Sequence, residues 1–426
     1  MTEEIFSNGF FYYGKNDKSH FTFTVRMVTK DPVDPESVEY AAAKAMERYS
    51  YIKKRLRRNW NKLWLEDNDL PVVVKKGSKS PVLGTAESNH HLIAVSFDES
   101  SIYLHAFHGL IDGCGSNNII RTLIYYYILY RYGIEIKHNG FRLIGDEIEE
   151  EEYIDPFPRK APDKDTASAG KTPRFISAMS LSEELKRMGR SCKYHPSTFM
   201  IHFAEEELNR VLAKHEATPI SLMSVLMARA VNKVTAGSRK NIGIGIPINF
   251  RPALNANKCY RSLIYSLHVI YDEKIKRLPV GKQCKAVRSK VRLQSNRDSV
   301  INELEFQRKI FNLINGVPFL PLKRTTAKII QSLNMGDESF LISYAGRAQF
   351  GGAEKYIEYI GVDVDPCGCD ILLEVSLING VYSVDIIQRF EDSIYIDAFV
   401  EELKREGIKI DLFEQRDANF PMVKIG

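Results

Sequence analysis

Hydrophobic and polar residues alternate along several short stretches of the chain. From residue 21 to residue 27 every second side chain is Phe, Val or Met, and this period of two predicts a strand with one buried face. Asp34 and Pro35 then supply a helix cap and a proline suited to a first turn, ahead of an alanine-rich run that predicts a helix to about Arg58. The same patterns predict further strands near residues 92–97, 101–107, 198–203, 242–248, 340–344, 371–377 and 382–389, and further helices near residues 117–132, 204–215, 219–234, 282–311 and 395–406.

The predicted strands and helices interleave along the whole chain. This order predicts sheets covered by helices, so we expect the α/β class, with an α+β sandwich in each half. A strand followed by a helix occurs at 21–58 and again at 198–215, and a strand, a polar turn and a helix occur at 101–132 and again at 382–406. These recurrences indicate either a weak internal duplication or the ordinary repetition of an α/β protein.

The length of 426 residues exceeds what one hydrophobic core usually serves, about 250–300 residues, so we expect two lobes. Between Gly145 and Arg174 the composition changes to a glutamate run followed by prolines and small polar residues, as is typical of a linker. We therefore predict an N-terminal lobe over residues 1–160, a linker over 161–178 and a C-terminal lobe over 179–426.

Charge and cysteine content narrow the functional classes. The net charge of +5 comes from 59 basic and 54 acidic residues scattered along the chain, which does not indicate a nucleic-acid-binding surface. The six cysteines lack the spacing of a disulfide framework, and the N-terminus lacks the features of a signal peptide. The most apolar helical stretch carries Arg121 and Arg131, so we expect no membrane span and a cytoplasmic, reducing location.

The residues that follow the predicted strand 101–107 are the main candidates for chemistry. His108 stands at the strand end, and Asp112 opens a turn between Gly109 and Gly113 into the next helix. An imidazole in this place could take a proton from a hydroxyl or an amine, and the glycines would let a ligand approach the backbone. The alternative is a buried structural histidine, with Asp112 serving only to cap the helix.

Residues 107–113 read Phe-His-Gly-Leu-Ile-Asp-Gly, which resembles the HHxxxDG motif of the chloramphenicol acetyltransferase-like acyltransferases. That superfamily includes nonribosomal peptide condensation domains, alcohol acetyltransferases, plant BAHD enzymes and polyketide-associated acyltransferases. Segments 245–252, 342–346 and 387–392 are similar to three later motifs of the two-lobed members. Together the four segments span nearly the whole chain in the family's order.

The resemblance implies a pseudo-dimer of two chloramphenicol acetyltransferase-like lobes with a tunnel between them. His108 would lie near the middle of the tunnel and act as the general base. Asp112 would have a structural role through an ion pair with Arg251, and Gly113 would allow close approach of the backbone to the acyl carbonyl. An acyl donor would enter from one face and an acceptor from the other.

This sequence departs from the family pattern in two places. Phe107 occupies the position of the first motif histidine, and Ser343-Tyr344 replaces the usual Ser-Asn. The Asp-Phe-Gly-Trp-Gly segment of the plant BAHD enzymes is absent, which disfavours that branch.

Three functions remain open from the sequence. The first is an acyltransferase that moves an acyl group from a coenzyme A thioester to a small alcohol or amine. The second is a condensation-type enzyme that takes its acyl group from an acyl or peptidyl carrier protein, and the third is an inactive homologue that binds a ligand without turnover. We expect no permanently bound cofactor, no metal site and a monomer, and the sequence does not identify the substrate-binding residues.

Other conspicuous residues have simpler explanations. The basic run at 53–58 predicts a solvated helix end rather than a phosphate site. Cys367 and Cys369 flank one glycine without a second Cys or His pair nearby, which favours a turn over a metal site. His105 and the pair at 90–91 are expected to fill a strand and a loop.

Overall fold

A computed structural model describes residues 2–5, 9–14, 19–138, 140–157, 178–334, 338–366 and 368–424 of the chain. The strands are β1 (Thr2–Glu4), β2 (Thr22–Thr29), β3 (Lys54–Arg58), β4 (Leu63–Asp67), β5 (Val74–Lys76), β6 (Ile93–Phe97), β7 (Ser101–Phe107), β8 (Tyr194–Ala204), β9 (Ile242–Asn249), β10 (Ile264–Tyr271), β11 (Phe340–Arg347), β12 (Ile357–Val364), β13 (Ile371–Ile378), β14 (Val381–Phe390) and β15 (Leu412–Asp417). The helices are α1 (Gly9–Tyr13), α2 (Pro35–Arg48), α3 (Gly113–Tyr132), α4 (Glu150–Tyr153), α5 (Leu181–Arg187), α6 (Glu205–His215), α7 (Pro219–Val234), α8 (Arg251–Leu254), α9 (Glu273–Lys276), α10 (Val280–Gln294), α11 (Arg297–Gly316), α12 (Leu320–Asn334) and α13 (Ile394–Arg405).

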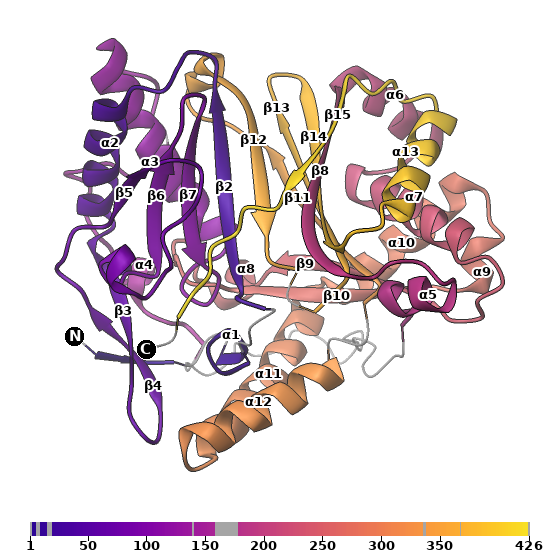
Figure 1. The fold of residues 1–426 in the computed structure, drawn as a ribbon, viewed down its shortest axis with the longest axis horizontal. Helices are drawn as coiled ribbons and strands as arrows, with labels where there is room; N and C mark the ends of the chain where they lie inside the picture. The colour runs from indigo at the N-terminus through magenta and orange to yellow at the C-terminus, as the bar shows by residue number, and fades with distance from the viewer. Residues whose placement is uncertain are drawn as a thin grey trace.

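The N-terminal lobe is built on a five-stranded sheet of order β12-β2-β7-β6-β5. Helices α2 and α3 lie side by side on its outer side (Figure 1). The Asp34 side chain accepts a hydrogen bond from the Ser37 amide, and Pro35 occupies the first turn, so α2 begins where the sequence predicts. Every residue of β7 is buried, so this strand lies at the centre of the lobe. The residues that directly follow β7 are therefore held in place by the lobe interior.

The C-terminal lobe is built on a seven-stranded sheet of order β10-β9-β11-β13-β14-β8-β15. Helices α6, α7, α10 and α13 cover its outer side (Figure 1). The apolar side chains of α7 and α13 pack with those of β9, β11, β13 and β14 in one hydrophobic core. The mixed sheets and covering helices agree with the predicted α/β sandwich class.

One strand crosses from the second lobe to the first. Strand β12 follows β11 in sequence, yet it pairs antiparallel with β2, from Ile357 opposite Thr29 to Val364 opposite Phe23. The C-terminal tail returns as well, because Val423 bridges to Leu83. Residues 158–177, which include most of the predicted linker, lie outside the described residues, so the lobe boundaries at 160 and 179 stay a prediction.

Two predicted helices differ from the structure. The helix expected to reach Arg58 ends at Arg48, and the basic run forms strand β3, which pairs with β4. The Lys54 side chain is buried and bonds to Glu3 and Asp67, so this run is not a solvated helix end. The single helical stretch expected at 282–311 is divided into α10 and α11, where Asn296 caps the second helix.

Three strands had no counterpart in the sequence analysis of the C-terminal half: β10, β12 and β15. Cys367, one of the two cysteines around Gly368, lies outside the described residues. Within the ranges that the structure describes, no helix has the length and apolar character needed to cross a membrane.

Candidate active site

His108 is the first residue after β7. Its backbone amide donates a hydrogen bond of 2.7 Å to the carbonyl of Phe21, which extends the pairing of β7 with β2 by one step. The imidazole lies between the rings of Phe11 and Phe23, at centroid distances of 5.1 and 5.3 Å. The side chain is partly buried and lines a cavity of about 690 Å³, a volume in the range of small-molecule sites.

The two ring nitrogens of His108 have different surroundings. Nδ1 lies 3.3 Å from the Ser262 hydroxyl, whereas the described residues offer Nε2 no hydrogen-bond partner. Burial lowers the pKa of His108 below 6.5, although the charge of Asp112 and a hydrogen bond to its own backbone act in the opposite direction. A neutral imidazole with one unengaged nitrogen on a cavity wall can accept a proton.

Asp112 and Arg251 form a buried ion pair between the two lobes. The guanidinium donates two parallel hydrogen bonds to the carboxylate, of 2.8 and 2.9 Å, and the two side chains are 4% and 0% exposed. The carboxylate also accepts bonds of 2.8 Å from the amides of Gly115 and Leu263. The pairing expected from the sequence is therefore present, and it joins the start of α3 to the start of α8 with bidentate geometry.

The segment that carries Ser262 wraps around this ion pair. Arg251 donates to the carbonyl of Cys259 at 2.8 Å and to the carbonyl of Arg261 at 2.5 Å. Because Leu263 is bonded to Asp112, the ion pair fixes the loop that places the Ser262 hydroxyl against His108. Asp112 acts on the imidazole through this loop and through its charge, not by direct contact with the ring.

Phe107, which replaces the first motif histidine, is fully buried and is not part of the contact between Ser262 and His108. Its ring packs edge-on against Tyr12 at 5.0 Å, and the Tyr12 hydroxyl donates to the carbonyl of Gly109 at 2.9 Å. A Cβ at Gly109 would lie 2.5 Å from the Phe107 ring. A glycine is required here because the aromatic pair packs directly against the backbone.

Gly113 and the beginning of α3 line the same cavity as His108. A Cβ at Gly113 would meet no atom within 4 Å, so there is free space for a ligand next to this backbone. The first amides of a helix carry partial positive charge, and this end of α3 favours a negative group nearby. The structure thus brings His108 and Gly113 onto one cavity, with Asp112 and Arg251 buried behind them.

Sequence reasoning missed two residues with chemistry of their own, one that contacts His108 and one that lines the cavity. Ser262 lies 154 positions from His108, and Glu374 lies on β13 of the C-terminal sheet. Neither belongs to the motifs quoted above. For Glu374, the signal was a single acidic residue in an otherwise apolar strand, which is a feature of sites as well as of solvated strands.

His105 faces a different environment. Its Nδ1 lies 2.8 Å from the Thr24 hydroxyl and its Nε2 lies 2.8 Å from the Ser96 hydroxyl. Burial lowers its pKa to about 3, with a small contribution from the charge of Lys75. Both nitrogens are engaged in the lobe interior, so His105 fills the strand as expected and does not take part in the site.

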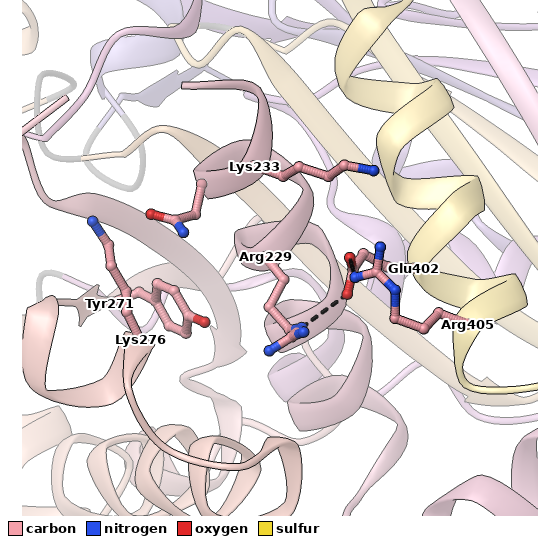
Figure 2. Close-up of a pocket in the computed structure, with 7 residues that line it drawn as sticks. Arg229, Lys233, Tyr271, Lys276, Glu402 and Arg405 are labelled. Atoms are coloured by element: carbon pink, nitrogen blue, oxygen red, sulfur yellow. Dashed lines mark hydrogen bonds and ion pairs between the residues drawn. The ribbon is translucent and has the colours of Figure 1, made fainter. Parts of the chain in front are cut away.

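A second pocket, of about 320 Å³, lies among the outer helices of the C-terminal lobe (Figure 2). Arg229 lies between Tyr271 and Glu402, and its guanidinium donates to the Glu402 carboxylate at 2.8 Å. Within the described part of the chain, this pocket shares no lining residue with the His108 cavity. We therefore place the candidate site in the larger cavity alone.

No protein-family model and no curated protein sequence matches this chain. Solved structures do match over nearly its full length. The first condensation domain of the CDA synthetase has a TM-score of 0.59 at 11% identity, covering 95% of both chains. TRI101 from F. sporotrichioides, complexed with coenzyme A and T-2, has 0.57 at 13%, covering 95% of this chain and 97% of its own. Polyketide synthase associated protein 5 from Mycobacterium tuberculosis has 0.58 at 11%, covering 95% and 96%.

These neighbours include condensation domains and acetyltransferases, and all of them share one fold. The match extends over both lobes, and the lobes are arranged as the sequence motifs imply. The chain therefore has the fold of the chloramphenicol acetyltransferase-like superfamily, which includes the condensation domains and the TRI101 acetyltransferases.

Proposed function

We propose that this protein is an acyltransferase that moves an acyl group from a coenzyme A thioester to an alcohol or amine, with His108 as the general base. The observation that carries the proposal is the position of His108. Its imidazole is held neutral by burial, has one nitrogen without a partner among the described residues, and lines a ligand-sized cavity. TRI101, a structural neighbour, was solved with coenzyme A.

Direct transfer needs one proton acceptor and no covalent enzyme intermediate. The acceptor oxygen or nitrogen attacks the thioester carbonyl carbon while Nε2 of His108 takes its proton. The tetrahedral intermediate then collapses, the carbon–sulfur bond breaks, and the imidazolium returns the proton to the leaving thiolate. The products are an ester or amide and free coenzyme A, so atoms and charge balance.

The other site residues support this role of His108. The Asp112–Arg251 pair fixes the loop that holds Ser262 against Nδ1, which leaves Nε2 for the acceptor. We place the developing oxyanion near Gly113, because the positive end of α3 lines the cavity there and leaves room for a ligand. Since one chain supplies both cavity walls, we propose that a monomer carries the whole site.

A carrier-protein thioester is the second candidate donor. The condensation domain of the CDA synthetase matches this fold as well as TRI101 does. The chemistry at His108 would be the same, and only recognition of the donor would differ. An inactive binding protein is the third candidate function, and the unengaged Nε2 of His108 argues against it.

Two measurements test the proposal. Coenzyme A should raise the thermal unfolding temperature, because a ligand that binds only the folded state stabilises it. Thiol release from a panel of acyl-coenzyme A thioesters should require both the enzyme and an alcohol or amine. If coenzyme A gives no shift and an acyl carrier protein thioester supports release, the donor is the carrier. No thiol release from either donor would refute the enzymatic function.

A further inference from the structure

The lining of the His108 cavity differs between the two sheets. On β2, β12 and β13 the lining residues follow every second position, so one face of each strand meets the cavity. The N-terminal sheet contributes mainly apolar side chains to this lining: Phe21, Phe23, Val25, Ile360, Val362 and Val364. The C-terminal sheet and the loop before β11 contribute apolar side chains as well, together with six polar ones: Ser266, His268, Glu338, Ser343, Glu374 and Ser376.

Glu374 is a carboxyl group of this lining that has no cationic side chain paired with it among the described residues. It lies in register between Ser343 on β11 and Asp385 on β14. The Ser343 hydroxyl bonds to its carboxylate, and no lysine, arginine or histidine of the described residues pairs with it. Burial raises the pKa of Glu374 to about 7, and the charge of Asp385 acts in the same direction.

The other acidic groups of the lining, Glu303, Glu338 and Asp365, already have partners. Glu338 accepts a bond of 2.5 Å from the Ser266 hydroxyl and lies 3.3 Å from Nδ1 of His268. Asp365 accepts a 3.0 Å bond from the Phe21 amide. Arg347 is paired with Glu205. A buried carboxyl group without a counter-ion either takes up a proton, as the raised pKa of Glu374 allows near neutral pH, or is ionised beside a ligand that supplies positive charge.

The sign of that charge identifies which substrate supplies it. Coenzyme A carries only negative charge at neutral pH, in its phosphates, so Glu374 cannot serve to bind it. We propose that the acceptor carries a protonated amino group, besides the hydroxyl or amine that reacts, and that Glu374 binds this ammonium. The inference rests on the proposed acyl transfer and makes the acceptor a diamine or an amino alcohol. The apolar lining of β2 and β12 would then contact the acyl chain and the hydrocarbon part of the acceptor.

A matched pair of acceptors tests the inference. Thiol release at pH 8 from an accepted acyl-coenzyme A is measured with 1,4-diaminobutane and with 1-aminobutane, which differ in the second amino group. A charge-assisted hydrogen bond predicts a preference of roughly 10- to 100-fold for the diamine in kcat/KM. Glu374→Gln should abolish this preference through KM, and Glu374→Asp should restore part of it. Glu358→Gln, which removes an exposed carboxylate from β12, should leave it unchanged.

Binding without turnover separates this inference from the acyl transfer itself. In the His108→Ala background, calorimetry should show tighter binding of 1,4-diaminobutane than of 1-aminobutane, and the added Glu374→Gln change should remove the difference. That result would support ammonium recognition even where no acyl transfer is found. Equal binding of the two amines, or a preference that survives Glu374→Gln, would overturn the inference.

Discussion

Two imidazoles lie three positions apart at β7, and their surroundings give them opposite properties. His105, inside the strand, has both nitrogens bonded to hydroxyls of neighbouring strands. His108, just beyond the strand end, has one nitrogen near Ser262 and the other without a described partner. Burial lowers the pKa of both rings, so a lowered pKa alone does not distinguish structure from chemistry. The free nitrogen and the cavity make that distinction.

The largest expected effect is on the rate of thiol release, which should depend on His108 and not on His105. His108→Ala should lower the rate of thiol release by about 10²–10⁴, the usual contribution of a general base. The thermal unfolding temperature should change little, because the ring lies on a cavity wall. Steady-state rates and circular dichroism melts check both statements. An unchanged rate would remove His108 from the mechanism.

The second prediction concerns the ion pair that fixes the end of β7. Asp112→Ala or Arg251→Ala should destabilise the fold by about 3–5 kcal/mol, because each leaves an uncompensated buried charge. The double variant should lose less than the sum of the two single losses. Urea unfolding of the four proteins measures the coupling. Additive losses would show that the pair does not act as a unit.

The interior histidine should affect stability and leave the chemistry intact. His105→Leu leaves the hydroxyls of Thr24 and Ser96 without their ring partners, which should cost about 1–3 kcal/mol. Thiol release at 20 °C should stay within a factor of about three of the unchanged protein, since His105 does not line the cavity. A loss of rate as large as that of His108→Ala would refute the contrast.

The smallest expected effect is a pH dependence of stability. Because the pKa of His105 is about 3 in the fold and near 6.5 when unfolded, the unfolded chain binds the proton first as the pH falls. The contribution of the neutral ring is therefore complete above about pH 6.5 and declines below it, by at most about 1.4 kcal/mol per pH unit. Urea unfolding between pH 7 and pH 5.5 should show a shallower decline for His105→Leu. Identical slopes would contradict the assignment.

Local patterns predicted much of what positions the candidate site. Strand β7 has the predicted bounds, and α3 ends at the predicted Tyr132 but begins at Gly113, four residues before the predicted start. Hydrophobic periodicity and capping chemistry act over a few residues, which is why such elements can be predicted from one segment. Arg251 could be named only because the resemblance supplied a partner that lies 139 positions away.

The features that escaped prediction depend on distant parts of the chain. Strand β3 is rich in basic residues and has strand geometry only because β4 pairs with it. The bounds of β12 depend on its pairing with β2, more than 300 residues earlier. Ser262 and Glu374 became site residues through the approach of separate segments. A single serine carries no local signal of that approach, and the acidic residue in a mostly apolar strand does not by itself identify what Glu374 faces.

The crossing of β12 also limits how substrates can reach the cavity. A strand from the second half completes the first half's sheet, so the halves are joined by a ladder of backbone hydrogen bonds as well as by side chains. Because β12 is covalently continuous with β11 and β13 of the second half, swinging the halves apart as a clam shell would have to strain these connections or break that ladder. We therefore expect substrates to enter and products to leave through permanent openings of the cavity or through small local shifts. The width of those openings, rather than a global opening motion, would then set which molecules reach the cavity.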